Sequence, residues 1–206
     1  MLVLSSAITY CTPGWTDPIS PEGCECAKPA KGGIAPSLIL IPKSWDPTVT
    51  KIDKDPATES YGEIVNIEIP VDANGDPQLA FALPIVEDSG SLTVACTEND
   101  NGSSTIQGDL PFQLKASAEF LAFVECNKCA VFQVLQCKNT GDWISACLRL
   151  NSWTFTTGAD PTADTCAIDV TFTNDNKYSD SLSFIDPTKG ITGLTAEELI
   201  EDLQGL

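Results

Sequence analysis

The chain has 206 residues, of which 42% are hydrophobic, and this proportion predicts a folded domain rather than wholesale disorder. Its 29 acidic and 11 basic residues give a net charge of −18, which argues against a nucleic-acid-binding module. It contains no histidine, which excludes a Ser-His-Asp or Cys-His catalytic arrangement within the chain. Such acidity is typical of a simply soluble protein, and it also suits the wall of a conduit to which passing DNA must not adhere.

Residues 1–31 are predicted to form an extended arm, because proline, glycine and other turn-forming residues recur along it. The arm includes Cys11, Cys24 and Cys26 and lacks the apolar runs needed for a core of its own, so we expect it to order against a neighbouring subunit. Residues 1–7 lack the basic segment and long apolar run of a secretory signal, and we expect no segment to cross a membrane. These features favour a protein made in a reducing cytoplasm.

Residues 32–186 have the pattern of a β-rich domain. Residues 34–42 form a short continuous apolar run, which predicts a strand buried on both faces. Residues 63–71 alternate instead. The alternation places Glu63, Val65, Ile67 and Ile69 on one face of a strand, and Ile64, Asn66 and Glu68 on the other.

The segment after this strand contains turn-forming residues. The spacing of Asp72, Asn74 and Asp76 resembles the start of a calcium-binding EF-hand loop, but the glycine and the bidentate glutamate that such a loop requires are missing. The Asn74-Gly75 pair instead predicts a tight hairpin turn, with residues 79–85 as the returning strand.

The remaining elements of this domain are strands around one helix. Residues 91–97 and 105–114 each have one apolar face and one face of small, hydroxylated, amide or acidic side chains, a pattern typical of a sheet with one solvent-exposed face. Residues 117–126 have the apolar spacing of a helix. Further strands are predicted over residues 130–137, 143–150, 151–157 and 165–173, with a short edge strand over residues 181–185.

Residues 187–206 are predicted to form a linker and a short capped helix. Thr195 and Glu198 have the spacing of a capping box, and Leu199, Ile200 and Leu203 form an apolar stripe. Such a helix docks either on its own domain or on a neighbour, and the sequence does not separate the two.

The cysteines permit several interpretations. There are nine, and the odd number leaves at least one outside any intramolecular set of disulfides. Four lie in strand-like runs, where we interpret them as small buried hydrophobic residues: Cys96, Cys137, Cys147 and Cys166.

Two cysteine pairs have metal-ligand spacing, namely Cys24 with Cys26 and Cys126 with Cys129. Together they would supply four thiolates for a tetrahedral zinc site that pins the arm to the end of the helix. Packing thiols are the interpretation that we favour, so no cofactor is expected, and disulfides are a third possibility outside a cell. No phosphate-binding loop, dinucleotide fingerprint or nucleophile elbow is present, so we do not expect an enzyme.

The order of elements over residues 32–175 resembles that of a known family. The matching features are Gly32-Gly33-Ile34 before the first strand, residues 88–93, the Asn101-Gly102 turn, the helix that passes directly into a hairpin with Thr140-Gly141-Asp142-Trp143, and residues 156–160 before the strand at residues 168–173. In this order the chain resembles the tail tube proteins of long-tailed bacteriophages, especially those of Bacteroidetes phages. The arm and the C-terminal helix depart from the family pattern.

The resemblance implies a mainly β fold, a tail-tube-like β-sandwich or barrel with one packed α-helix, to which this chain adds the extended arm and the short C-terminal helix. It implies a structural virion protein of the tail, assembled in the host bacterial cytoplasm, whose hexameric rings stack into a tube with other tail proteins and conduct DNA into the host. A related virion component, such as a tail terminator, connector or baseplate hub part, is an alternative. A secreted, disulfide-bearing β-domain is another.

In such a tube, polar strand faces are expected to line the bore, because the apolar faces turn toward the core. The residues concerned are Asn66, Glu68, Thr93, Thr97, Thr105, Gln107 and Asp109. A wall of hydroxyls, amides and carboxylates holds DNA weakly, so DNA is expected to pass without binding.

Overall fold

The computed structural model describes residues 37–52, 62–86, 89–98, 104–137, 142–156, 167–175, 182–190 and 193–206. Its strands are β1 (Ser37–Pro42), β2 (Thr48–Lys51), β3 (Ile64–Glu68), β4 (Phe81–Pro84), β5 (Thr93–Glu98), β6 (Ser104–Lys115), β7 (Val131–Cys137), β8 (Trp143–Thr156), β9 (Ala167–Asp175) and β10 (Ser183–Ile185). Its helices are α1 (Ala118–Cys126) and α2 (Ala196–Gln204), with short 3-10 turns η1 (Lys43–Trp45) and η2 (Pro187–Lys189). The predicted mainly β fold is confirmed, whereas the predicted arm lies outside the described residues.

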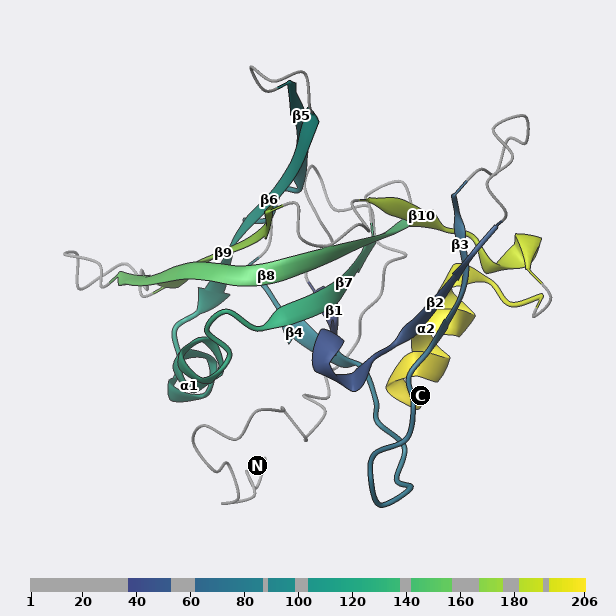
Figure 1. The fold of residues 1–206 in the computed structure, drawn as a ribbon. Helices are drawn as coiled ribbons and strands as arrows, with labels where there is room; N and C mark the ends of the chain where they lie inside the picture. Colours follow the sequence, from purple (N-terminus) through teal and green to yellow (C-terminus); the bar gives the residue numbers. More distant parts are fainter. Residues whose placement is uncertain are drawn as a thin grey trace.

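The strands form one forked sheet around β8 (Figure 1). On one side β8 pairs with β7, which leads to β1 and β4. On its other side β8 pairs first with β10, which leads to β3 and β2, and then with β9, which leads to β6 and β5. The fork is possible because β8 is 14 residues long and offers two successive stretches of the same edge.

A bulge within β8 keeps its apolar residues on the core side of the sheet. The register with β9 shifts between Leu150 and Ser152, so one extra residue is accommodated there. Leu150 is buried in the core and Trp153, three residues later, packs against the same core. The strands predicted separately at residues 143–150 and 151–157 are therefore one bulged strand.

The path from β4 to β6 curls the sheet into a half-barrel. After β4 the chain leaves β1 and approaches β6, where the Val86 N–H donates to the Gln113 carbonyl at 2.8 Å. The Ser91 N–H donates to the Pro111 carbonyl at 3.3 Å, and the Gln113 N–H donates to Ser89 Oγ at 3.0 Å. The chain then continues as β5, which pairs with β6. The connection from β4 to β5 therefore links β4, at one end of the curled sheet, to β6, near the other end.

Aromatic side chains fill the space that this curl encloses. The Phe132 ring stacks on Phe172 at a centroid distance of 5.8 Å, and it meets Phe81 and Phe123 at 6.2 Å each. Phe123 comes from α1, whose first turn is capped by the Ser117 side chain. Because these rings are fully buried, the space inside the half-barrel is a packed core among the described residues.

Helix α2 covers a second apolar cluster on the opposite face of the sheet. Leu199, Ile200 and Leu203 are buried against residues of β1, β3, β4, β7, β8 and β10. The predicted capping box between Thr195 and Glu198 is present, and the Leu203 carbonyl accepts a hydrogen bond from the Ala80 N–H at 2.8 Å. The C-terminal helix therefore docks on its own domain.

The predicted hairpin between β3 and β4 is wrong, although its turn forms. Asp72 Oδ1 accepts hydrogen bonds from the backbone N–H groups of Asn74 and Asp76, at 2.8 and 2.9 Å. However, β3 pairs with β2 and β10, whereas β4 pairs with β1. The first three residues of β4 are buried, with side chains in both apolar clusters, and β1 provides a neighbour that is likewise buried on both faces.

The predicted faces of β3 also need a correction. Ile64 and Ile67 pack in the same apolar cluster although they are three residues apart. The register with β2 shifts between Thr50 and Lys51, so Val65 has no opposite partner. This shift reverses the alternation, and Ile64 no longer shares a face with Asn66 and Glu68.

The close approach of η2 to this part of β3 makes Gly190 sensitive to substitution. A Cβ atom at Gly190 would lie 2.9 Å from the Cβ of Val65 and 3.3 Å from the Val65 carbonyl oxygen. We expect Gly190→Ala to lower the free energy of unfolding by about 1–3 kcal/mol, because backbone and β-branched atoms cannot give way cheaply. Urea unfolding measures this change. Gly108→Ala is the control, since its Cβ would meet only ordinary contacts at 3.7–3.8 Å, and an equal loss in both variants would contradict the steric argument.

Candidate functional site

A polar surface runs over β5, β6 and β9 on the side away from the aromatic core. In β6, Leu110 and Phe112 point into the core, so Gln107 and Asp109 lie on the opposite face. The register continues this face into β5, where Thr93 is paired with Asp109. The backbone positions of Thr97 and Thr105 are paired further along the same two strands.

Hydrogen bonds among the side chains of this surface link neighbouring positions. Gln107 Nε2 donates to Asp109 Oδ2 at 3.3 Å, within β6. Gln113 Nε2 donates to Asp169 Oδ1 of β9 at 2.8 Å, across the strands. The surface thus presents amides, hydroxyls and carboxylates, with one of these hydrogen bonds along β6 and the other across to β9.

The structure does not bring all the predicted bore residues together. Asn66 and Glu68 lie in β3, on the face turned away from the cluster under α2, and Asn66 Nδ2 donates to Glu68 Oε1 at 2.9 Å. Gln107 and Asp109 are turned away from the aromatic core instead, and the two cores occupy opposite faces of the sheet. The residues therefore form two separate polar surfaces, and their place along a bore stays a prediction.

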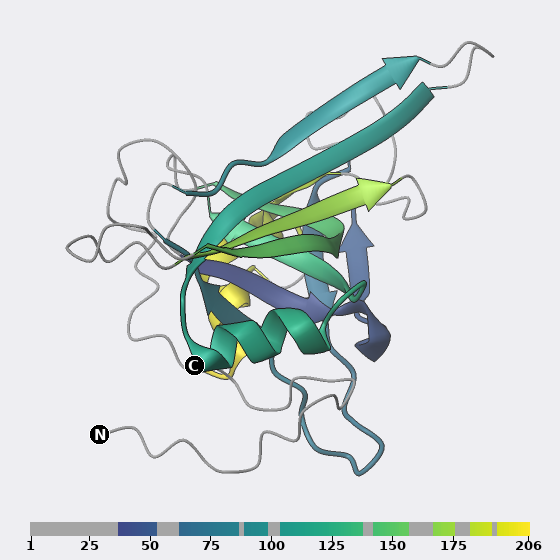
Figure 2. The same ribbon diagram turned by 90° about the vertical axis from the view of Figure 1, so that its left-hand side faces the viewer.

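The hairpin of β5 and β6 projects beyond the rest of the sheet, as the paired teal strands in Figure 2 show. β6 has 12 residues, but only the stretch from Gln107 to Lys115 is paired with β9. Among the described residues, β5 pairs with β6 alone, so its outer edge has no strand beside it. Val94, near the start of β5, is 40% exposed. A projecting strand with an open edge can add a strand from another chain.

The predicted cysteine roles are only partly described. Cys137 and Cys147 are buried, as predicted for packing thiols. Cys126 is half-buried at the end of α1, and Cys129 is exposed beside it in the sequence. Cys24, Cys26, Cys166 and the side chain of Cys96 lie outside the described residues. Within the described ranges no group of three or more potential ligands could hold a metal, and the zinc site stays a prediction.

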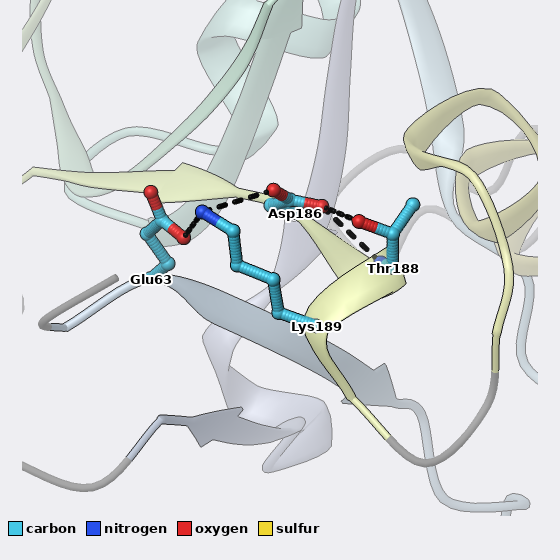
Figure 3. Close-up of polar contacts among 4 residues, drawn as sticks. All are labelled: Glu63, Asp186, Thr188 and Lys189. Carbon is cyan, nitrogen blue, oxygen red and sulfur yellow. Dashed lines mark hydrogen bonds and ion pairs between the residues drawn. The ribbon is translucent and has the colours of Figure 1, made fainter. Parts of the chain in front are cut away.

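A charged cluster that sequence analysis missed pins η2 to the start of β3 (Figure 3). Lys189 Nζ lies 2.7 Å from Glu63 Oε2 and 3.3 Å from Asp186 Oδ2. Asp186 also accepts hydrogen bonds from the backbone N–H and the hydroxyl of Thr188. Only the Asp-Pro-Thr start of η2 is visible in the sequence, because Glu63 is far away along the chain. The cluster is partly exposed and its groups pair with one another, so it serves to hold the C-terminal segment in place.

The pKa of Asp186 gives this cluster a testable pH dependence. The Thr188 hydroxyl, and then Lys189, hold the pKa of Asp186 below its ordinary value. A lowered pKa in the folded state stabilises the protein above the unfolded-state pKa, and this contribution is lost as the pH falls through the lowered value. We expect Asp186→Asn to remove this part of the acid sensitivity, at a cost below about 1 kcal/mol near neutral pH. Urea unfolding from pH 2 to 7 tests this, and an unchanged acid dependence would contradict it.

Comparison with known proteins identifies no relative. No family model matches the chain, and no curated protein or solved structure matches it either. None of the helices in the described part of the chain is long and apolar enough to cross a membrane.

Proposed function

We propose that this protein is a structural subunit that assembles into rings, and that the rings stack into a tube of the bacteriophage-tail type through which DNA passes. The observation that carries the proposal is the projecting β5–β6 hairpin, whose outer strand edge has no partner among the described residues. A soluble chain normally protects such an edge, and pairing with a second copy is one way to do so. The order of elements in the sequence, which resembles that of tail tube proteins, supports the same assignment.

The packed interior supports a channel between copies rather than within one. Phe81, Phe132 and Phe172 fill the curl of the sheet, so the described part of a single subunit leaves no room for a nucleic acid strand inside this curl. A bore must then be built from outer surfaces of several subunits. The polar surface of β5, β6 and β9 is suited to such a wall, because it offers Gln107, Asp109 and hydroxyl groups to the solvent.

The net charge of the chain also supports a role as the wall of a bore. A wall with the negative charge of this chain, −18 per subunit, repels phosphate groups. DNA is then not held by counterion release. Base stacking on exposed aromatic rings would hold single strands, but Gln107, Asp109 and Thr93 offer no such platform. The proposal therefore assigns the protein to conduction of DNA and not to its recognition.

Electron microscopy of the purified full chain tests the proposal. Tubes, or rings that stack at high concentration, are the expected result. Rings that never stack would favour the terminator, connector or hub alternative. A monodisperse monomer at the highest soluble concentration, in both low and high salt, would contradict the proposal and favour the secreted β-domain.

A further inference from the structure

We propose that ionic strength controls the self-association of this protein, so that copies repel one another at low salt and assemble as salt is raised. The inference rests on the proposed function, because it concerns contacts between copies. Each subunit carries a net charge of −18, so any contact between identical subunits brings together bodies of like charge. A net charge far from zero keeps proteins monomeric, and dissolved salt screens it over a Debye length of about 10 Å at 0.1 M.

The structure places much of this charge on outward surfaces. Helix α2 buries Leu199, Ile200 and Leu203 and therefore turns its other side to solvent. That side is acidic, and no basic residue lies within the helix; its exposed carboxylates are Glu197, Glu198, Glu201 and Asp202. A second copy approaching this side meets four carboxylates and no basic residue of the helix.

Two basic residues lie where they do little to offset this repulsion at η2 and at the projecting hairpin. Lys189 is paired with Glu63 and Asp186 of its own subunit, at 2.7 and 3.3 Å. Within β5 and β6 the one basic residue is Lys115, at the end of β6 away from the projecting part of the hairpin. Among the described side chains of these two strands, Asp109 carries a negative charge and Lys115 is the one cation.

The absence of histidine makes salt, rather than pH, the variable that acts near neutrality. With no imidazole in the chain, the group that most often changes charge between pH 5 and 8 is missing. Repulsion between subunits therefore stays nearly constant in that range, and screening by dissolved ions is what reduces it.

Sedimentation velocity of the full chain, over a concentration series, tests the inference. Between about 20 mM and 300 mM NaCl we expect the association constant to rise on the order of tenfold or more. Magnesium chloride at equal ionic strength should act nearly as sodium chloride does. An association constant that is flat, or that falls with salt, overturns the inference and leaves the proposed function standing. A much larger effect of magnesium would indicate a bound divalent cation and overturn screening as the cause. No association in any salt contradicts the proposed function, and this inference with it.

Paired variants of α2 separate charge from shape. We expect E197Q/E201Q to associate at lower salt than the natural chain, because two negative charges are removed from an exposed helix side. E197D/E201D keeps both charges and should follow the natural salt dependence. Equal behaviour of the two variants would contradict the electrostatic account. Glu198 is left unchanged because it completes the capping box.

Discussion

Phe132→Ala is expected to lower the free energy of unfolding by about 3–5 kcal/mol, the range for a large aromatic side chain removed from a packed core. Phe132 is 1% exposed, and its ring contacts the rings of Phe81, Phe123 and Phe172. It stacks on Phe172 at 5.8 Å, with an interplanar angle of 9°, and meets the edge of Phe81 at 6.2 Å. Its removal leaves a cavity where strands from both sides of the half-barrel meet α1.

Urea unfolding followed by circular dichroism measures this change. Phe155→Ala is the matched control, because Phe155 is 45% exposed, and we expect it to cost well under half as much. If the Phe132 variant does not fold, Phe132→Leu provides a milder deletion whose cost should lie between the two. Equal costs for Phe132→Ala and Phe155→Ala would contradict the described core.

Proline at one of two neighbouring positions of β5 is expected to abolish most self-association while the subunit stays folded. Val94 is paired with Gly108 and Ala95 with Gln107. Along an antiparallel edge strand, consecutive N–H groups point alternately to the paired strand and to the open edge. Of Val94→Pro and Ala95→Pro, one therefore removes a bond to β6, and the other removes only an outward N–H group.

The two variants act as controls for each other. The proline that removes the inward bond should lower the thermal unfolding midpoint. The proline that removes the outward N–H should leave that midpoint nearly unchanged but weaken association on the order of tenfold or more, since a lost hydrogen bond is worth about 1 kcal/mol per contact and the ring adds a clash. Val94→Ala controls for lost packing against Gly108. If the well-folded proline variant associates as the natural chain does, the open edge of β5 is not the contact.

Elements with local signals could be predicted from the sequence. The capping box of Thr195 and Glu198 and the stripe of Leu199, Ile200 and Leu203 lie within a few residues of one another, and α2 forms as expected. The burial of Cys137 and Cys147 followed from their places in apolar strands. In each case the information needed is carried by neighbours along the chain.

Long-range pairing could not be predicted in this way. The Asn74-Gly75 turn is real, but whether β4 returns to β3 or crosses to β1 depends on which partner buries both of its faces. The bulges in β3 and β8 shift the alternation of inward and outward residues by one position. Such a shift is hard to recognise in the sequence of apolar and polar residues. The Lys189 cluster joins residues 126 positions apart, a contact created by the fold itself.

A cryo-electron microscopy reconstruction of the assembled protein tests the central claim most directly. The account predicts a ring in which the outer edge of β5 pairs with a strand of the next subunit and Gln107 and Asp109 face the bore. It would be contradicted by an assembly in which the β5 edge stays open and these two residues lie on the outer wall, or by the absence of any ring.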